Sequence, residues 1–164
     1  MLREPPSRVA TAGAKVVPLH SFRKAQSFES HFELGRLYRE QGRLDDAIRE
    51  WQRAMAMDRE HLEVRLDLGV ALAEKGLLDQ AVACFKNATE LDPSCAEAHY
   101  YLGLAYFQQN QMEEAVQVWI TCLRLDPEDL ELRLSLAEAY MELGKHKKAQ
   151  GQLDKILKIG RAHV

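Results

Sequence analysis

The chain has 164 residues, 46% of them hydrophobic and 29% charged, which suits one soluble globular or repeat domain with an apolar interior. No run of about 18 apolar residues is present, so we expect no segment that spans a membrane. Residues 1–28 hold five of the 22 basic side chains and one of the 25 acids, which leaves an acidic body with a net charge of −7.

Residues 1–27 are predicted to form a basic, flexible N-terminal tail. The first residues, MLREPPSRVATAG, lack the apolar stretch of a secretory signal. Farther along, the segment KVVPLHSFRK (residues 15–24) places apolar side chains between Lys15 and the pair Arg23 and Lys24, and Pro18 favours an extended conformation. A solvated leader is one alternative. A transit peptide is another, although the three prolines of the tail disfavour a long amphipathic helix.

A period of 34 residues begins after the tail. One set of small residues recurs at Gly35, Gly69, Gly103 and Ala137, and a second set at Ala47, Ala81, Ala115 and Ala149. A large side chain follows at Trp51, Phe85, Trp119 and Leu153. Between the two small sets stand Gly42, Gly76, Asn110 and Gly144, and both residue types accept the left-handed conformation that ends a helix. We therefore expect four repeats of helix, tight turn and helix, at 28–61, 62–95, 96–129 and 130–161.

The ends and the packing of these helices can also be predicted. The tripeptide LDP, at 91–93 and 125–127, is expected to stop the second helix of repeats 2 and 3. Repeat 1 departs from this pattern, with MDR at 57–59. Because small residues permit two helices to approach closely, Gly35 is expected to face Ala47, and Trp51 to fill the space between its own repeat and the next.

This pattern resembles the tetratricopeptide repeat, whose period is 34 residues and whose signature is W-x2-L-G-x2-Y, followed by A-x3-F, A and P. The first copy reads His31, Leu34, Gly35, Tyr38, Ala47, Trp51 and Ala54, and the third reads His99, Leu102, Gly103, Tyr106, Ala115, Trp119, Cys122 and Pro127. The first aromatic position departs from the signature, with His, Arg, His and Arg in the four copies. The resemblance implies an all-α solenoid of four helix-turn-helix repeats, wound as a right-handed superhelix.

The resemblance also implies that the first helix of each repeat lines a concave groove. The free positions of these helices supply a predicted apolar floor of Phe32, Leu66, Val70, Tyr100, Leu104, Phe107, Leu134 and Met141. A predicted acidic rim consists of Glu63, Glu97, Glu131 and Glu142. Such a groove favours an apolar peptide with basic flanks, helical or extended. The alternatives are that neighbouring helices cover the apolar residues and that the first-turn glutamates serve only the helix dipole.

A protein-interaction adaptor is therefore the predicted function, and the tail segment Lys15 to Lys24 is itself a candidate ligand, in its own groove or in a neighbour's. Some members of the family hold acidic chaperone tails with a clamp of Lys and Asn, which the resemblance would place at Phe32, Arg36, Leu66, Val70, Glu97 and Tyr101, so that clamp is missing. The second hypothesis is a self-associating scaffold. Its edge would be Leu153, Ile156 and Leu157 in the last helix, which Gly160 is expected to end.

Other classes of function find no support in the sequence. The common catalytic and phosphate-binding motifs are missing, so we expect neither an enzyme nor a cofactor. Cys84, Cys95 and Cys122 are irregularly spaced, which favours reduced packing residues in a cytoplasmic protein over a disulfide framework or a zinc site. His31 and His99 share one repeat position and are predicted to pack in place of the usual Trp. The acidic body disfavours nucleic acid as a partner.

Overall fold

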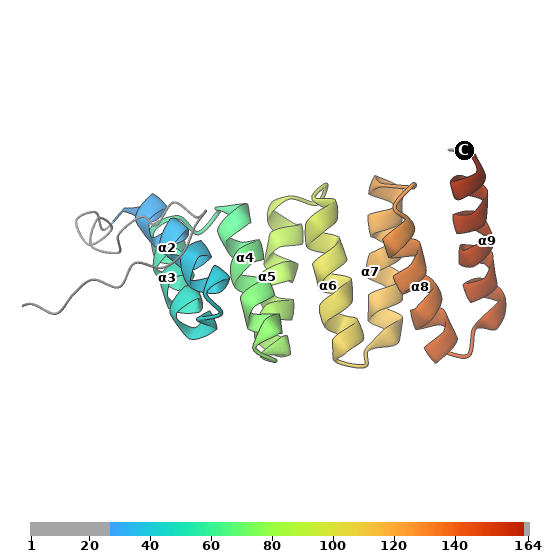
Figure 1. The fold of residues 1–164 in the computed structure, drawn as a ribbon, viewed down its shortest axis with the longest axis horizontal. Helices are drawn as coiled ribbons and strands as arrows, with labels where there is room; N and C mark the ends of the chain where they lie inside the picture. The colour runs from blue at the N-terminus through green and yellow to red at the C-terminus, as the bar shows by residue number, and fades with distance from the viewer. Residues whose placement is uncertain (1–26, 163–164) are drawn as a thin grey trace, which may run out of the picture.

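The computed structural model describes residues 27–162. These residues form eight helices and no strand, which confirms the predicted all-α solenoid for this part of the chain. The helices are α2 (Phe28–Glu40), α3 (Leu44–Met57), α4 (Leu62–Glu74), α5 (Leu78–Leu91), α6 (Ala96–Gln108), α7 (Met112–Leu125), α8 (Leu130–Glu142) and α9 (His146–Ala162). Figure 1 shows them as successive antiparallel pairs along the long axis of the molecule, with α2 towards one end and α9 at the other.

The turn inside each pair confirms the prediction from the recurring Gly and Asn. Gly42, Gly76, Asn110 and Gly144 all have a positive φ, between 62° and 80°. The residue after each of them donates its N–H to a carbonyl five positions back, as in the bond from Arg43 to Tyr38 (2.8 Å). This bond satisfies a carbonyl that the end of the helix would otherwise leave without a partner.

An aspartate side chain stabilises each turn between two repeats. The Oδ1 atoms of Asp58, Asp92 and Asp126 accept backbone N–H bonds of 3.0, 2.9 and 3.1 Å from the residue two positions on. Helices α5 and α7 end directly before their aspartate and proline, as predicted. Helix α3 ends at the same repeat position without a proline, because Asp58 alone makes the same turn.

The two helices of a pair meet through a glycine and an aromatic ring. A Cβ atom on Gly35 would lie 2.6 Å from Cδ1 of Trp51. A Cβ atom on Gly69 would likewise lie 2.6 Å from Cε1 of Phe85. The atoms nearest to the Cβ on Gly35 all belong to Trp51, so the aromatic ring is the neighbour that this glycine admits. The indole ring lies against α2, where its Nε1 donates to the Phe32 carbonyl (3.2 Å), and this close approach requires a residue without a side chain.

The position that holds Trp in the signature has a polar role in this chain. Arg65 and Arg133 donate to the carbonyls of Arg59 and Pro127, and His99 Nε2 donates to the Pro93 carbonyl (3.0 Å). All three carbonyls belong to the turn that precedes the donor's own repeat. His99 was predicted to be a packing residue. It also forms a hydrogen bond that links its repeat to the turn at the end of the preceding one.

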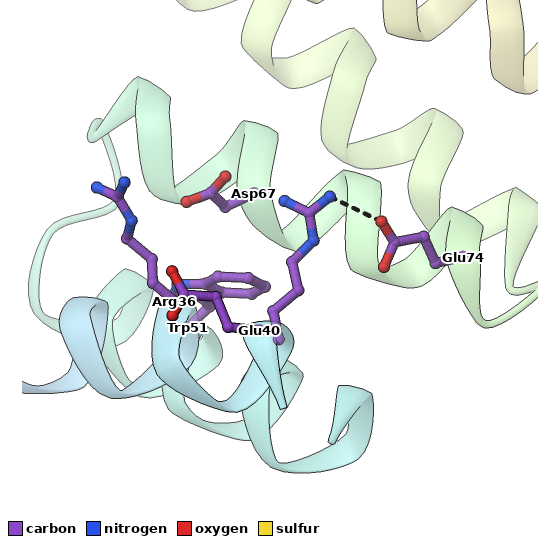
Figure 2. A pocket seen from close by; sticks show the side chains of 6 residues that line it. Arg36, Glu40, Trp51, Asp67 and Glu74 are labelled. Atoms are coloured by element: carbon purple, nitrogen blue, oxygen red, sulfur yellow. Dashed lines mark hydrogen bonds and ion pairs between the residues drawn. The ribbon is translucent and has the colours of Figure 1, made fainter. Parts of the chain in front are cut away.

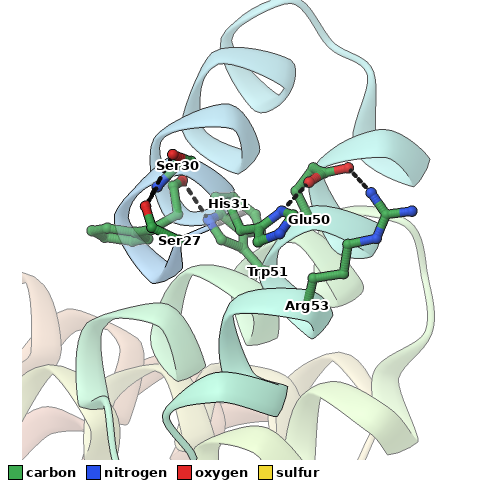
Figure 3. Close-up of polar contacts among 7 residues, drawn as sticks. Ser27, Ser30, His31, Glu50, Trp51 and Arg53 are labelled. Atoms are coloured by element: carbon green, nitrogen blue, oxygen red, sulfur yellow. Dashed lines mark hydrogen bonds and ion pairs between the residues drawn. The ribbon is translucent and has the colours of Figure 1, made fainter. Parts of the chain in front are cut away.

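His31 occupies the same position in the first repeat and finds another partner. Its Nδ1 donates to Oε2 of Glu50 (2.6 Å), and Arg53 donates to the other carboxylate oxygen (2.7 Å), as Figure 3 shows. Glu50 is buried, so these two bonds compensate for the loss of water around its charge.

The last helix is longer than predicted. Helix α9 continues through Gly160 to Ala162, so the expectation that Gly160 ends it is wrong. Gly160 is not among the glycines with a positive φ, and nothing packs beside it to force a turn. The segment Lys15 to Lys24 lies outside the described residues.

Candidate functional site

The predicted groove is lined by α2, α4, α6 and α8, the first helices of the four repeats. Their positions five, nine and twelve share one face because they are spaced at about one and two helical turns. Val70, Tyr100, Leu104 and Phe107 are half-buried on this face. On the last groove helix, Leu134 is 48% and Met141 51% exposed. Apolar side chains therefore become more accessible from α4 towards α8.

Two predicted floor residues belong mainly to the core. The ring of Phe32 packs against Phe28 and His61, with centroids 6.0 and 5.6 Å away, and is buried. Leu66 is also buried, although its edge borders a hollow of about 620 Å³ with Glu63 and Glu97. Covering by neighbouring side chains, one of the alternatives above, thus applies to these two positions.

The middle of the groove is an apolar pocket between α4 and α6. It has a volume of about 310 Å³, and its lining includes Val70, Ala73, Leu104 and Tyr101. Tyr101 was not predicted as a floor residue. It stacks on Phe85 (5.5 Å between centroids), and burial, followed by the nearby Glu97, raises the pKa of its hydroxyl. Its signal in the sequence is an aromatic residue at repeat position six, where the other copies are polar.

The N-terminal end of the groove is charged. A pocket of about 430 Å³ lies between α2 and α4, and Arg36 and Arg39 of α2 line it together with Asp67 and Glu74 of α4. Figure 2 shows Arg36, Asp67 and Glu74 around this pocket. Arg39 donates to Glu74 (2.7 Å), and Arg36 lies 3.6 Å from Glu63. Burial raises the pKa of Asp67, and the two guanidinium groups counteract part of this effect. Ion pairs within the protein therefore satisfy much of the charge at this end.

On α6 and α8 the acids of the predicted rim have no basic partner among residues 27–162. Glu97, Glu131 and Glu142 are exposed, and none of them forms an ion pair with a residue in the range 27–162. Glu97 and Glu131 border a hollow of about 230 Å³ beside Tyr100, together with Asp126 and Asp129. Burial and then Glu131 raise the pKa of Tyr100. The C-terminal half of the groove thus combines exposed apolar side chains with negative charge.

The remaining candidate residues lie elsewhere. Leu153 and Leu157 are exposed on α9 and Ile156 is half-buried there, far from the N-terminal half of the groove.

Cys122 Sγ donates to the Ala96 carbonyl (3.2 Å), and burial raises the pKa of this thiol to about 11, as suits a packing residue. In residues 27–162 no three potential ligands gather into a metal site, and no helix combines the length and hydrophobicity of a membrane span.

Comparison with known proteins agrees with this architecture. A family model described as "Tetratricopeptide repeat" matches residues 32–83 and 66–119, and one described as "TPR repeat" matches residues 103–144. No curated protein matches the chain by sequence.

Three solved structures show the same fold. "Crystal structure of MamA" is 23% identical with a TM-score of 0.81, and the match covers 86% of this chain and 82% of that one. "Crystal structure of MamA protein" is 27% identical with a TM-score of 0.77, covering 82% and 73%. "MamA 41-end from Desulfovibrio magneticus RS-1" is 21% identical with a TM-score of 0.80, covering 85% and 78%. Because the family models match more than half of the sequence and the helices stack in the predicted register, the chain belongs to the tetratricopeptide repeat family.

Proposed function

We propose that this chain is a protein-interaction adaptor whose concave groove binds an apolar peptide with basic flanks. Membership of the tetratricopeptide repeat family supports a role in protein–protein interaction. The observation that carries the finer proposal is the surface of α6 and α8. Leu134 and Met141 are half-exposed there, Tyr100 and Phe107 are half-buried, and the glutamates of the same two helices are exposed. Apolar strips of this kind, rimmed by charge, are typical of surfaces that bind proteins.

The apolar side chains and the acids of this surface would recognise different parts of the ligand. Tyr100, Phe107, Leu134 and Met141 supply the apolar contact, and aromatic anchors of this kind commonly carry much of the binding energy. The acids Glu97, Glu131 and Glu142 select against acidic ligands and accelerate the encounter with basic ones. Glu63 contributes less, because Arg36 already neutralises part of its charge.

The tail supplies the first ligand to test. Its segment Lys15 to Lys24 has an apolar centre and basic ends, although it lies outside the described residues. Neither a catalytic group nor a cofactor is needed for such a role, so the expectation of a non-enzymatic protein belongs to the same proposal. The cytoplasmic location inferred from the three cysteines belongs to it as well.

A fluorescence-anisotropy titration tests the groove. The full chain is added to labelled KVVPLHSFRK and, separately, to the charge-reversed EVVPLHSFEE. We expect saturable binding of the first peptide, weakened by salt, and little binding of the second. Met141→Glu should lower the affinity by roughly tenfold or more, since it places a charge against the apolar part of the ligand.

Met57→Glu is the matched control. Met57 is as exposed as Met141, at 51%, but it lies at the end of α3, outside the helices that line the groove. Equal losses in the two variants, or equal binding of the two peptides, would contradict the proposed groove.

A self-associating scaffold is the second candidate function, and the exposure of Leu157 on α9 favours it. Light scattering tests it on the full chain. A mass that stays at the monomer value of 18.7 kDa at every concentration would contradict a scaffold.

A further inference from the structure

The last helix differs from the equivalent helix of every other repeat. In α3, α5 and α7 the large apolar side chain of the second helix is buried, at Trp51, Phe85 and Trp119. Its counterpart in α9, Leu153, is 36% exposed, and Leu157, one turn later, is 59% exposed. The inner helices are covered on this side by the first helix of the next repeat, whereas no helix follows α9 within residues 27–162.

Charge also distinguishes α9. The helix carries five basic side chains, all exposed, and a single acid: Lys147, Lys148, Lys155, Lys158 and Arg161 against Asp154. Asp154 accepts a hydrogen bond from Gln150 (2.9 Å). Leu153, Leu157 and Arg161 are spaced by four residues and so share one face of the helix. The outer face of α9 thus combines a short apolar strip with Arg161, and Lys158 adjoins it on the same side.

A surface with the opposite charge and the same apolar character lies in the groove. On α6 and α8, Tyr100, Phe107, Leu134 and Met141 offer apolar surface, and the exposed acids beside them are Glu97, Glu131, Glu138 and Glu142. We propose that α9 of one copy docks in this C-terminal half of the groove of a second copy. This inference rests on the proposed function, since it names an edge of the chain itself as one ligand of the groove.

The occupant must come from another molecule. Helix α9 packs on α8 through Ala149, which is fully buried, and Figure 1 places α9 at the end of the array. The groove is lined by first helices, and α9 is the second helix of its repeat. It would have to leave α8 to enter its own groove, so only a second copy can receive it.

An anionic membrane would attract the same lysines, but it fits the apolar face less well. A helix that lies in a membrane surface buries a broad apolar face among the lipids. Helix α9 offers two exposed leucines, and Ile156 beside them is half-buried in the protein. A groove that supplies both a narrow apolar floor and acids matches this face better.

The contact would be heterologous, because the docking edge and the receiving groove are different surfaces. Each copy can then bind two neighbours, and the assembly grows with concentration instead of stopping at a symmetric dimer. Because charge contributes to the contact, salt should weaken it.

Sedimentation velocity of the full chain tests this inference with a pair of charge-reversed proteins. One carries Lys158→Glu and Arg161→Glu on α9, and the other carries Glu138→Lys and Glu142→Lys in the groove. The unaltered chain should rise, as its concentration increases, from 18.7 kDa to roughly twice this mass or more. Each reversed protein alone should stay monomeric, since like charges face each other in both.

The mixture of the two reversed proteins is the decisive sample. Both kinds of contact are then complementary, so association should return. A mixture that stays monomeric overturns the proposal, as does an α9 variant that associates normally. Loss of association in the α9 variant alone would indicate a symmetric contact between α9 helices and would also overturn it. A chain that stays monomeric but sediments with vesicles containing phosphatidylserine would show that α9 serves a membrane instead.

One further titration separates this inference from the proposed function. The α9-reversed protein should bind labelled KVVPLHSFRK at least as tightly as the unaltered chain does, because its groove is intact and no α9 competes for it. If the peptide binds and the chain does not self-associate, only the docking of α9 is contradicted. If the peptide does not bind, the proposed peptide-binding function is contradicted too. The unlabelled peptide, added in excess, should dissociate the assembly by competing for the groove.

Discussion

The two halves of the groove place different chemistry on the same repeat positions. At position twelve the first repeat has Arg39, which pairs with Glu74, whereas the third and fourth repeats have Phe107 and Met141. The N-terminal half therefore holds its charges in ion pairs within the protein. The C-terminal half exposes apolar side chains and acids that form no ion pair with residues 27–162. Both halves are built on one scaffold of glycines, rings and turns. The repeat signature thus determines the fold, and the free positions determine what each half can bind.

The common scaffold can be broken at Gly103, for which we expect the largest effect. An added Cβ would overlap the indole ring of Trp119, even its Cε2 atom lying only 2.8 Å away. The ring is held by a bond from its Nε1 to the Tyr100 carbonyl (3.2 Å) and has little freedom to move. Gly103→Ala should lower the free energy of unfolding by roughly 1–3 kcal/mol, measured by urea denaturation.

Two other glycines show whether the scaffold is shared. Gly35→Ala should cost a similar amount, because Trp51 occupies the equivalent place in the N-terminal half. Gly151→Ala is the control within a helix: nothing lies within 4 Å of its added Cβ, so it should stabilise by about 0.5–1 kcal/mol. A cost at Gly103 without a cost at Gly35 would mean that the two halves differ in scaffold as well as in surface.

The next largest effect should come from His31, which is specific to the N-terminal repeat. His31→Leu leaves the buried Glu50 with Arg53 as its remaining partner, and a bond to a charged group typically contributes about 1.5–3 kcal/mol. His99→Leu removes only an exposed bond to a loop carbonyl and should cost about 1 kcal/mol or less. Urea denaturation of both variants measures the difference. Equal costs would show that Glu50 does not depend on His31.

The sequence predicted the scaffold well because its signals are local. Gly and Asn accept the positive φ that ends a helix, and Gly42 and Asn110 adopt it between the two helices of their repeats. The period of 34 residues then places every helix to within a few residues. Gly160 was the exception, since a glycine ends a helix only where the chain must turn.

The groove was predicted less completely because exposure depends on neighbours. Phe32 is buried by Phe28 and by His61 of the next repeat, and the spacing of groove positions carries no sign of this. The pairing of Arg39 with Glu74 joins residues 35 positions apart through long side chains, whose rotamers the pattern does not specify. Tyr101 was missed because the predicted apolar floor was taken from positions five, nine and twelve alone.

Arg36 and Arg39 can be used to make the two halves of the groove alike. The double variant Arg36→Val and Arg39→Ala copies the residues of the second repeat and removes two positive charges near the proposed ligand. At about 10 Å each charge repels a basic flank by roughly 0.4 kcal/mol in water, so KVVPLHSFRK should bind about fourfold more tightly at low salt. Fluorescence anisotropy measures the change, and high salt should abolish it.

A second double variant tests whether position matters. Arg43→Ala and Arg49→Ala remove the same charge from the start of α3, where both arginines pair with Asp46. The peptide affinity should change less than for the groove variant. The same gain from both would mean that net charge, and not the groove, controls binding.

The smallest expected effect concerns Asp67, between the two arginines. Burial raises the pKa of this carboxyl above 3.8 in the folded protein, so the folded state binds the proton more tightly than the unfolded state does. Its charged form therefore lowers stability at pH 7, and this cost disappears as the pH falls through the raised pKa and below 3.8. Asp67→Asn should accordingly raise Tm slightly at pH 7 and have no effect near pH 3. A lower Tm at pH 7 would show that attraction to Arg36 and Arg39 outweighs burial, and that this end of the groove is held together by its charges.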